Sequence, residues 1–184
     1  MQLTPRILAY VASEEAIGLS AYLDPKGIWT WSLGIAESGG NAVRQYRDNP
    51  QPLEACLQAA IALLQTGFVP VLAKAFAGQA LAEHQIAGAL SFAWRNGPGN
   101  LLTAQWVKDV LAGRPTSARA SFMQWTDHGR QLARATRERD LFFDARWPAD
   151  LRVRIFAAKG PQYQPVGGRL TNVLPQLQQI MGGR

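Results

Sequence analysis

The sequence predicts an α+β fold with an N-terminal helix, a small antiparallel β-hairpin and a mostly helical C-terminal part. Three observations support this prediction. Apolar residues recur at helical spacing near the N-terminus, a turn signal separates two strand-like stretches between residues 21 and 35, and residues 53–143 return to helical spacing. The chain has 184 residues, of which 47% are hydrophobic and 17% charged, as is typical of one globular domain with a hydrophobic core.

The first helix is predicted from a capping signal and a repeating apolar face. Thr4 is a suitable N-cap, and Pro5 fits the first helical position, which needs no backbone N–H. The apolar positions that follow at helical spacing are Ile7, Leu8, Val11 and Ala12. We expect this helix to end between Glu15 and Gly18, because glycine is a poor interior residue and a strand pattern follows.

A β-hairpin is predicted from residues 21–24 and 28–35, which flank the turn sequence Asp-Pro-Lys-Gly at 24–27. Aspartate first, proline second and glycine fourth are the residues that a type I turn prefers. Gly27 can adopt the left-handed conformation, which gives a three-residue loop followed by a bulge.

The register of this hairpin decides which side chains meet. A three-residue loop pairs Tyr22 with Thr30, and it places Asp24 and Thr30 on one face as diagonal neighbours, roughly 7–8 Å apart. A water molecule could bridge that separation. A two-residue loop would put the two side chains on opposite faces.

The remainder of the chain is predicted to be helical up to residue 143. Residues 36–52 form a loop, and the predicted helices are 53–65, 70–77, 83–95 and 101–112, with one or two more in 115–143. We expect Gly67 to end the helix that begins at residue 53. No apolar run is then expected to reach the ~20 residues that span a bilayer.

The last segment differs in composition. Residues 145–156 alternate arginine with apolar residues, 161–168 are rich in proline and glycine, and 171–181 fit a short amphipathic helix. We expect residues 1–143 to form the main domain and residues 144–184 to form a C-terminal extension packed on it.

Composition also restricts the classes of partner that we expect. The chain carries a net charge of +6, which favours an anionic partner. Its single cysteine excludes an internal disulfide. We expect Cys56 to be a core residue. No zinc-finger spacing, RNA-binding aromatic motif or metal-ligand cluster is found, so we expect no nucleic-acid partner, no metal and no cofactor. The N-terminus makes a poor signal peptide, which predicts a cytoplasmic protein when it is made.

Three polar side chains near the N-terminus suggest a chemistry. Glu15 and Asp24 are paired acids, and such pairs cleave glycosidic bonds: one protonates the leaving oxygen while the other activates water or attacks carbon. An apolar helix side would keep Glu15 protonated, whereas Asp24 at an exposed turn would stay ionised. The alternative is structural, with Glu15 at a helix end and Asp24 stabilising the turn.

The order and spacing of these residues resemble the phage-type lysozymes of glycoside hydrolase family 24. Asp24 follows Glu15 by nine positions and Thr30 follows Asp24 by six, inside Ala-Tyr-Leu-Asp-Pro-Lys-Gly-Ile-Trp-Thr at 21–30. Downstream, residues 81–99 resemble the family's central-helix segment, and the signature around 125–142 resembles its C-terminal part. The resemblance covers about residues 8–143 and implies a lysozyme-like catalytic domain at 1–143.

The resemblance implies a muramidase that inverts the sugar carbon. Glu15 would protonate the bond between N-acetylmuramic acid and N-acetylglucosamine, while Asp24 and Thr30 would activate a water from the other face. Trp94 and Arg95 match positions that face the sugar cleft, although core packing is an alternative for Trp94. The histidine that the family usually carries after its threonine strand is replaced by Ile35.

Three functions remain open. The first is a phage endolysin, made in the host cytoplasm and released by a holin to act on peptidoglycan in the periplasm or cell wall. The second is a lytic transglycosylase on the same bond, and the third is a non-catalytic wall-binding or virion module. We expect a monomer, with an anionic outer-membrane or wall surface as a further partner.

Overall fold

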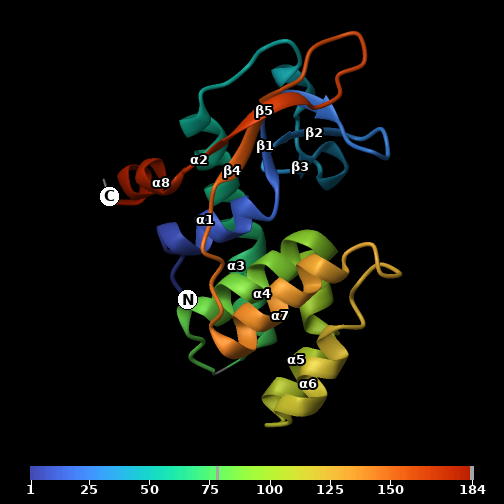
Figure 1. The fold of residues 1–184 in the computed structure, drawn as a ribbon, viewed down its shortest axis with the longest axis vertical. Helices are drawn as coiled ribbons and strands as arrows, with labels where there is room; N and C mark the ends of the chain where they lie inside the picture. The colour runs from blue at the N-terminus through green and yellow to red at the C-terminus, as the bar shows by residue number, and fades with distance from the viewer. Residues whose placement is uncertain (78, 183–184) are drawn as a thin grey trace. The chain divides into compact units, whose positions relative to one another are not determined.

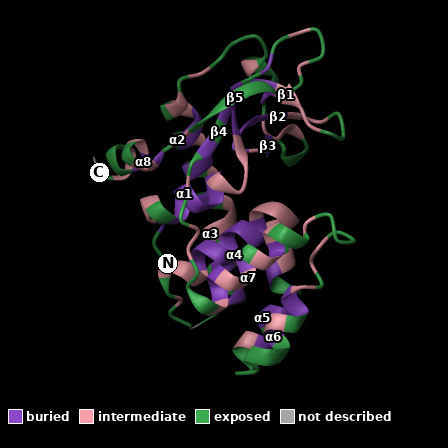
Figure 2. Ribbon diagram, in the orientation of Figure 1, coloured by how far each residue is buried: buried purple, intermediate pink, exposed green. Residues whose placement is uncertain are grey.

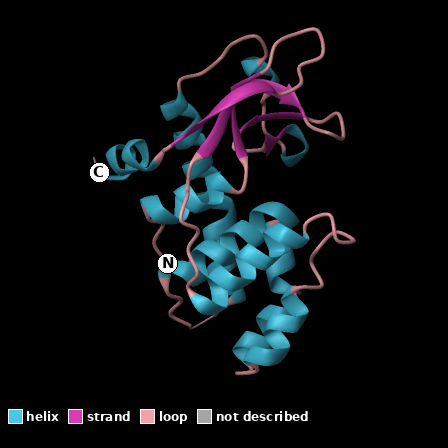
Figure 3. Ribbon diagram, in the orientation of Figure 1, coloured by secondary structure: helices cyan, strands magenta, loops and turns pink. Residues whose placement is uncertain are grey.

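The computed structural model describes residues 1–77 and 79–182, which fold into two compact units (Figure 1). The helical unit comprises Met1–Ile7 and Leu64–Ala149, and the sheet unit comprises Leu8–Leu63 and Asp150–Arg184. Figure 3 shows that the strands gather in the sheet unit, whereas the helical unit is drawn with helices and loops. The α+β fold predicted from the sequence, with an N-terminal helix and a mostly helical later part, is confirmed.

The sheet unit is built on five strands in the order β3-β2-β1-β4-β5. Its strands are β1 (Ala16–Leu23), β2 (Trp29–Ser32), β3 (Ile35–Ala36), β4 (Val153–Ala157) and β5 (Val166–Thr171). The pairing of β1 with β4 is parallel, and the other pairings are antiparallel. The sheet is thus larger than the predicted hairpin, because the segment after residue 150 adds two strands to it.

Helices complete the sheet unit. They are most of α1 (Pro5–Ser13), the 3-10 turns η1 (Glu37–Gly39) and η2 (Arg44–Tyr46), α2 (Leu53–Leu63) and α8 (Leu174–Gly182). The last of these confirms the amphipathic helix predicted over residues 171–181. The expected end of the first helix is wrong: α1 stops at Ser13, and Gly18 lies inside β1, paired with Ser32.

The helical unit is organised around α4 (Glu83–Asn96), whose residues from Ile86 to Ala93 are all buried (Figure 2). Around it lie the π-turn η3 (Leu64–Phe68), α3 (Val69–Ala75), η4 (Pro98–Leu102), α5 (Gln105–Leu111), α6 (Pro115–Phe122) and α7 (Leu132–Asp144). Gly88 lets α7 approach closely, because a Cβ there would lie 3.0 Å from both the Glu138 carbonyl and the Phe142 Cβ. Aromatic rings fill the core: Phe76, Phe92, Trp106, Phe122 and Phe142.

One helix is longer than the sequence predicts. The π-turn η3 carries the chain past Gly67, so that α2, η3 and α3 form one helix, Leu53–Ala75. Its 23 residues and mean hydropathy of 1.7 meet the length and composition of a membrane span, which corrects the expectation that no apolar run is long enough. Core helices of soluble proteins meet the same criteria. The exposed positions of this helix include Glu54, Gln58 and Lys74, which makes it amphipathic.

Candidate active site

The turn of the β1–β2 hairpin fixes the carboxylate of Asp24. The Gly27 N–H donates to the Asp24 carbonyl at 2.9 Å, and Gly27 adopts a φ of 75°, as predicted. The Asp24 Oδ1 accepts hydrogen bonds from the backbone N–H groups of Lys26 and Ile28, both at 2.8 Å. Among the described residues no donor reaches Oδ2, so this oxygen is available to water.

The register predicted for the hairpin is confirmed. Tyr22 pairs with Thr30, and the Asp24 N–H donates to the Ile28 carbonyl at 3.0 Å. Thr30 is only 3% exposed, and its hydroxyl donates to the Ile28 carbonyl at 3.1 Å. That bond uses the proton of the hydroxyl and leaves lone pairs on Oγ1 that can accept a hydrogen bond.

Glu15 lies at the junction between α1 and β1, directly before Ala16. Its backbone N–H donates to the Ala12 carbonyl at 3.1 Å, and its side chain is half-buried. The expectation that Glu15 shares the apolar side of the first helix is wrong, because α1 ends at Ser13. The acid instead follows the carbonyl end of that helix.

Tyr22 is a residue whose importance the sequence reasoning missed. Burial raises the pKa of the Tyr22 phenol well above its usual value, and the negative charges of Glu15 and Asp24 raise it further. Both acids are therefore close enough to act on this phenol, which stays protonated as a hydrogen-bond donor. The cross-strand pairing of Tyr22 with Thr30 was the signal that could have identified it.

These side chains can support acid–base chemistry in the sheet unit. One carboxyl lies at the end of a helix and the other at a turn, and a buried hydroxyl and a neutral phenol lie on the same hairpin. One acid can donate a proton while the other holds a water molecule. The structure thus brings Glu15, Asp24 and Thr30 into one unit.

Trp94 and Arg95 belong to the helical unit. The half-buried Trp94 ring stacks on Phe68, with centroids 5.0 Å apart. The Arg95 guanidinium donates to the Glu138 carboxylate at 2.6 Å and to the Trp125 carbonyl at 2.7 Å. These bonds hold Arg95 inside the unit.

Glu138 is the centre of a buried polar cluster that the sequence reasoning did not identify. Its side chain is 0% exposed and accepts hydrogen bonds from Ser91 at 2.7 Å and from Arg134 at 3.0 Å, in addition to Arg95. The spacing of Arg134 and Glu138, four residues apart on a helix, was the available signal. A buried carboxylate needs this number of partners to offset its lost hydration.

Comparison with known proteins adds to this geometry. A protein-family model described as phage lysozyme matches residues 12–140 of the chain. No curated protein sequence matches it significantly.

Solved structures share the fold. The endolysin from Escherichia coli O157:H7 phage FAHEc1 is 20% identical, with a TM-score of 0.68 over 80% of this chain and 97% of that chain. A mutant of P22 lysozyme is 21% identical, with a TM-score of 0.64 over 78% and 99%. The muramidase domain of SpmX from Asticaccaulis excentricus is 19% identical, with a TM-score of 0.58 over 77% and 97%. At identities of 19–21% these matches show that the chain shares the fold of the three proteins.

Proposed function

The chain belongs to the phage lysozyme family, and we propose on this basis that it is an endolysin muramidase. It hydrolyses the β-1,4 bond between N-acetylmuramic acid and N-acetylglucosamine in bacterial peptidoglycan. Two solved proteins of the same fold, an endolysin and a lysozyme by name, support the assignment. The observation that carries it is the hairpin register, which pairs Tyr22 with Thr30 and holds Asp24 at the turn.

Glu15 is the proposed general acid that protonates the leaving glycosidic oxygen. Its half-buried side chain at the junction of α1 and β1, in the same unit as Asp24 and Thr30, supports this role. Both Glu15 and Asp24 raise the pKa of the Tyr22 phenol, which supports their acting in one site.

Asp24 and Thr30 are the proposed water-holding pair. The Oδ2 of Asp24 would accept a proton from the attacking water, and the Thr30 oxygen would orient it. A bridging water on the face of the sugar opposite the acid gives inversion, for which the two carboxyl groups must stand roughly 6.5–9.5 Å apart.

Trp94 is proposed to contact the sugar. Its indole is held against Phe68, so a sugar ring could pack on it with little loss of side-chain freedom. Arg95 is proposed to contribute to sugar binding from the same helix, with its guanidinium held in place by Glu138 and the Trp125 carbonyl.

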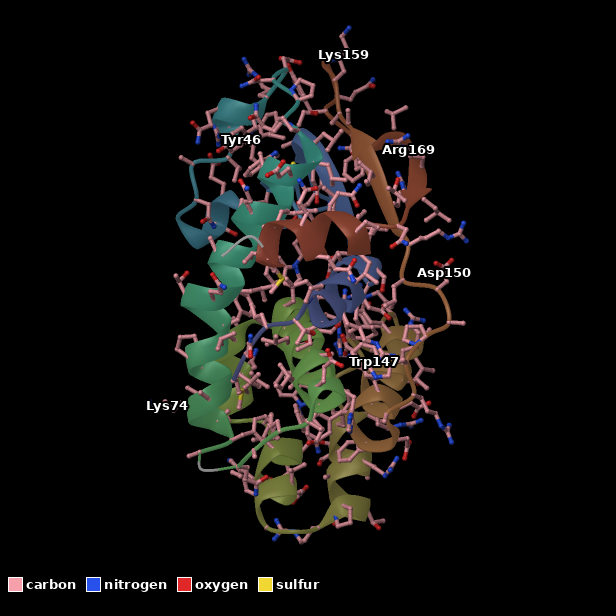
Figure 4. The ribbon with its side chains drawn as sticks, turned by 90° about the vertical axis from the view of Figure 1, so that its left-hand side faces the viewer. Tyr46, Lys74, Trp147, Asp150, Lys159 and Arg169 are labelled. Atoms are coloured by element: carbon pink, nitrogen blue, oxygen red, sulfur yellow. The ribbon has the colours of Figure 1, made fainter. Side chains whose placement is uncertain are left out.

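We further propose that the protein acts as a monomer on the cell wall after release from the host cytoplasm. The net charge of +6 favours association with an anionic wall or outer-membrane surface. Lys159 and Arg169 are exposed and project outward from the sheet unit (Figure 4), where they could meet such a surface.

Replacing the proposed acid tests the function. Glu15→Gln keeps the shape of the side chain but cannot donate the proton, so we expect hydrolysis of purified peptidoglycan to fall by at least about 10²-fold. The measurement is the clearing of a peptidoglycan suspension together with the release of new reducing ends.

The neighbouring acid provides a matched control. Glu14→Gln removes the same charge one residue earlier in the chain, and it should keep most of the activity. Equal clearing by wild type and Glu15→Gln would reject Glu15 as the acid, and loss in both variants would point to a general effect of charge.

A further inference from the structure

A segment outside the region matched by the family model runs along the strand that leads to Asp24. The match ends at residue 140, whereas residues 153–163 follow β1 along its length. Ala16, Ile17 and Gly18 pair with the parallel strand β4. Further along, the Ser20 hydroxyl donates to the Ala158 carbonyl at 2.8 Å and accepts from the Ala158 N–H at 2.9 Å.

The segment ends at the tip of the hairpin, on Tyr163. The Leu23 N–H, one residue before Asp24, donates to the Tyr163 carbonyl at 2.8 Å. The Tyr163 ring meets the ring of Trp29, one residue before Thr30, edge to face at 5.1 Å. The Tyr163 hydroxyl donates to the Asp48 carboxylate at 2.7 Å, which ties the contact to a second loop.

Tyr163 packs on the face of the hairpin that does not carry Thr30. Side chains alternate between the two faces of a strand, so the Leu23–Trp29 pair lies opposite the Tyr22–Thr30 pair. The contact with Tyr163 is therefore made on the face of the hairpin opposite Tyr22 and Thr30.

The tip of a hairpin needs such support if its side chains are to keep a fixed separation. Two antiparallel strands alone are marginally stable in water, and the short strand β3 adds pairs at Thr30 and Trp31. A displacement of about 1 Å in a catalytic group can reduce the rate by about 10²-fold.

We propose that residues 153–163 form a brace for the catalytic hairpin, with Tyr163 as the positioning residue that sets the separation of Asp24 and Thr30. The catalytic part of this statement depends on the proposed function. The brace itself depends only on the contacts between residues 153–163 and the hairpin.

Removal of the Tyr163 ring tests whether residues 153–163 support the hairpin. Tyr163→Ala removes the contact with Trp29 and the hydrogen bond to Asp48, whereas Tyr163→Phe removes only the hydrogen bond. On soluble glycan strands we expect Tyr163→Ala to lower kcat by about 10- to 100-fold with KM within about twofold. Tyr163→Phe should restore most of kcat. Leu170→Ala, at an exposed position of β5 in the same extension, is the control and should match wild type.

Amide hydrogen exchange provides a readout that is independent of activity. In Tyr163→Ala the amides of residues 19–32 should exchange at least about tenfold faster, while the amides of α4 keep their wild-type rates. Unchanged exchange at the hairpin in a folded variant would overturn the brace, as would an unchanged kcat in an active enzyme. A wild-type protein that solubilises no peptidoglycan would instead reject the proposed function.

Discussion

Gly18 occupies a position in β1 where any side chain would collide with Tyr22. A Cβ there would lie 2.8 Å from two ring carbons of Tyr22 and 3.2 Å from the ring of Phe156. The Tyr22 ring cannot move aside freely, because it packs edge to face on Phe156 at 5.0 Å. The glycine thus allows the phenol beside Glu15 and Asp24 to keep its place.

Gly18→Ala is therefore expected to impair both stability and activity. Overpacking of this kind destabilises a protein by about 1–3 kcal/mol, and displacement of Tyr22 should lower hydrolysis by about tenfold. Urea unfolding and the rate of peptidoglycan hydrolysis measure the two effects. Gly99→Ala is the control, because a Cβ at Gly99 meets no atom within 4 Å. Wild-type activity in Gly18→Ala would show that the Tyr22 position does not matter.

The sequence predicted the local structure around some of these residues better than around others. The Asp24 turn and the pairing of Tyr22 with Thr30 are confirmed, because a type I turn followed by a left-handed glycine determines a register locally. The setting of Glu15 was predicted wrongly, since the end of α1 depends on where the β1–β4 pairing begins. Glu138 was missed, because its partners converge only when α4 and α7 pack.

At the scale of elements, α5 and α6 are joined through one carboxylate. The Asp109 side chain is only 5% exposed and accepts hydrogen bonds from Gln105 at 2.9 Å, Ser121 at 2.9 Å and Arg114 at 2.7 Å. The Arg114 guanidinium, followed by Gln105, lowers the pKa of Asp109 below its usual value of 3.8. The carboxylate form is therefore favoured by the folded helix pair.

This pKa shift predicts a pH-dependent effect of Asp109→Asn. A lowered pKa in the folded state stabilises the protein above the ordinary pKa, and the contribution disappears as pH falls toward the folded value. The Tm of Asp109→Asn should lie below that of wild type at about pH 6–7, and the difference in Tm should shrink below about pH 4. Thermal unfolding followed by circular dichroism across this range measures it.

An exposed ion pair offers the matched control for this experiment. Asp127 and Arg130 have side chains that are 49% and 73% exposed, so Asp127→Asn should change Tm little at any pH. A Tm difference for Asp109→Asn that stays constant from neutral to acidic pH would contradict the assignment.

The ends of two elements show why local sequence signals are not enough to predict where helices and strands begin and end. Gly67 and Pro70 both suggest a break, yet the helix Leu53–Ala75 continues through the π-turn, and Pro70 follows the end of that turn by two residues. Similarly, β1 extends back to Ala16 because β4, far along the sequence, supplies a parallel partner. Tertiary packing decided both boundaries.

At the scale of the whole molecule, the order of helical and alternating apolar patterns along the sequence was enough to predict the α+β class but not the full sheet. A helical pattern, an alternating pattern and a longer helical part give the class directly. The pairing that makes β1 an interior strand joins residues more than a hundred positions apart, and neither turn chemistry nor periodicity specifies it. The same pairing connects β4 to the strand that leads to Asp24.

Glu15 is proposed to act opposite a water held by Asp24 and Thr30, and the configuration of the new reducing end distinguishes this mechanism from its alternatives. Attack by that water should give N-acetylmuramic acid first as the α-anomer, which can be followed by NMR on soluble glycan strands before mutarotation. The α-anomer as the initial product of wild type is the predicted result. An initial β-anomer, or a 1,6-anhydro product, would reject attack by a water held by Asp24 and Thr30.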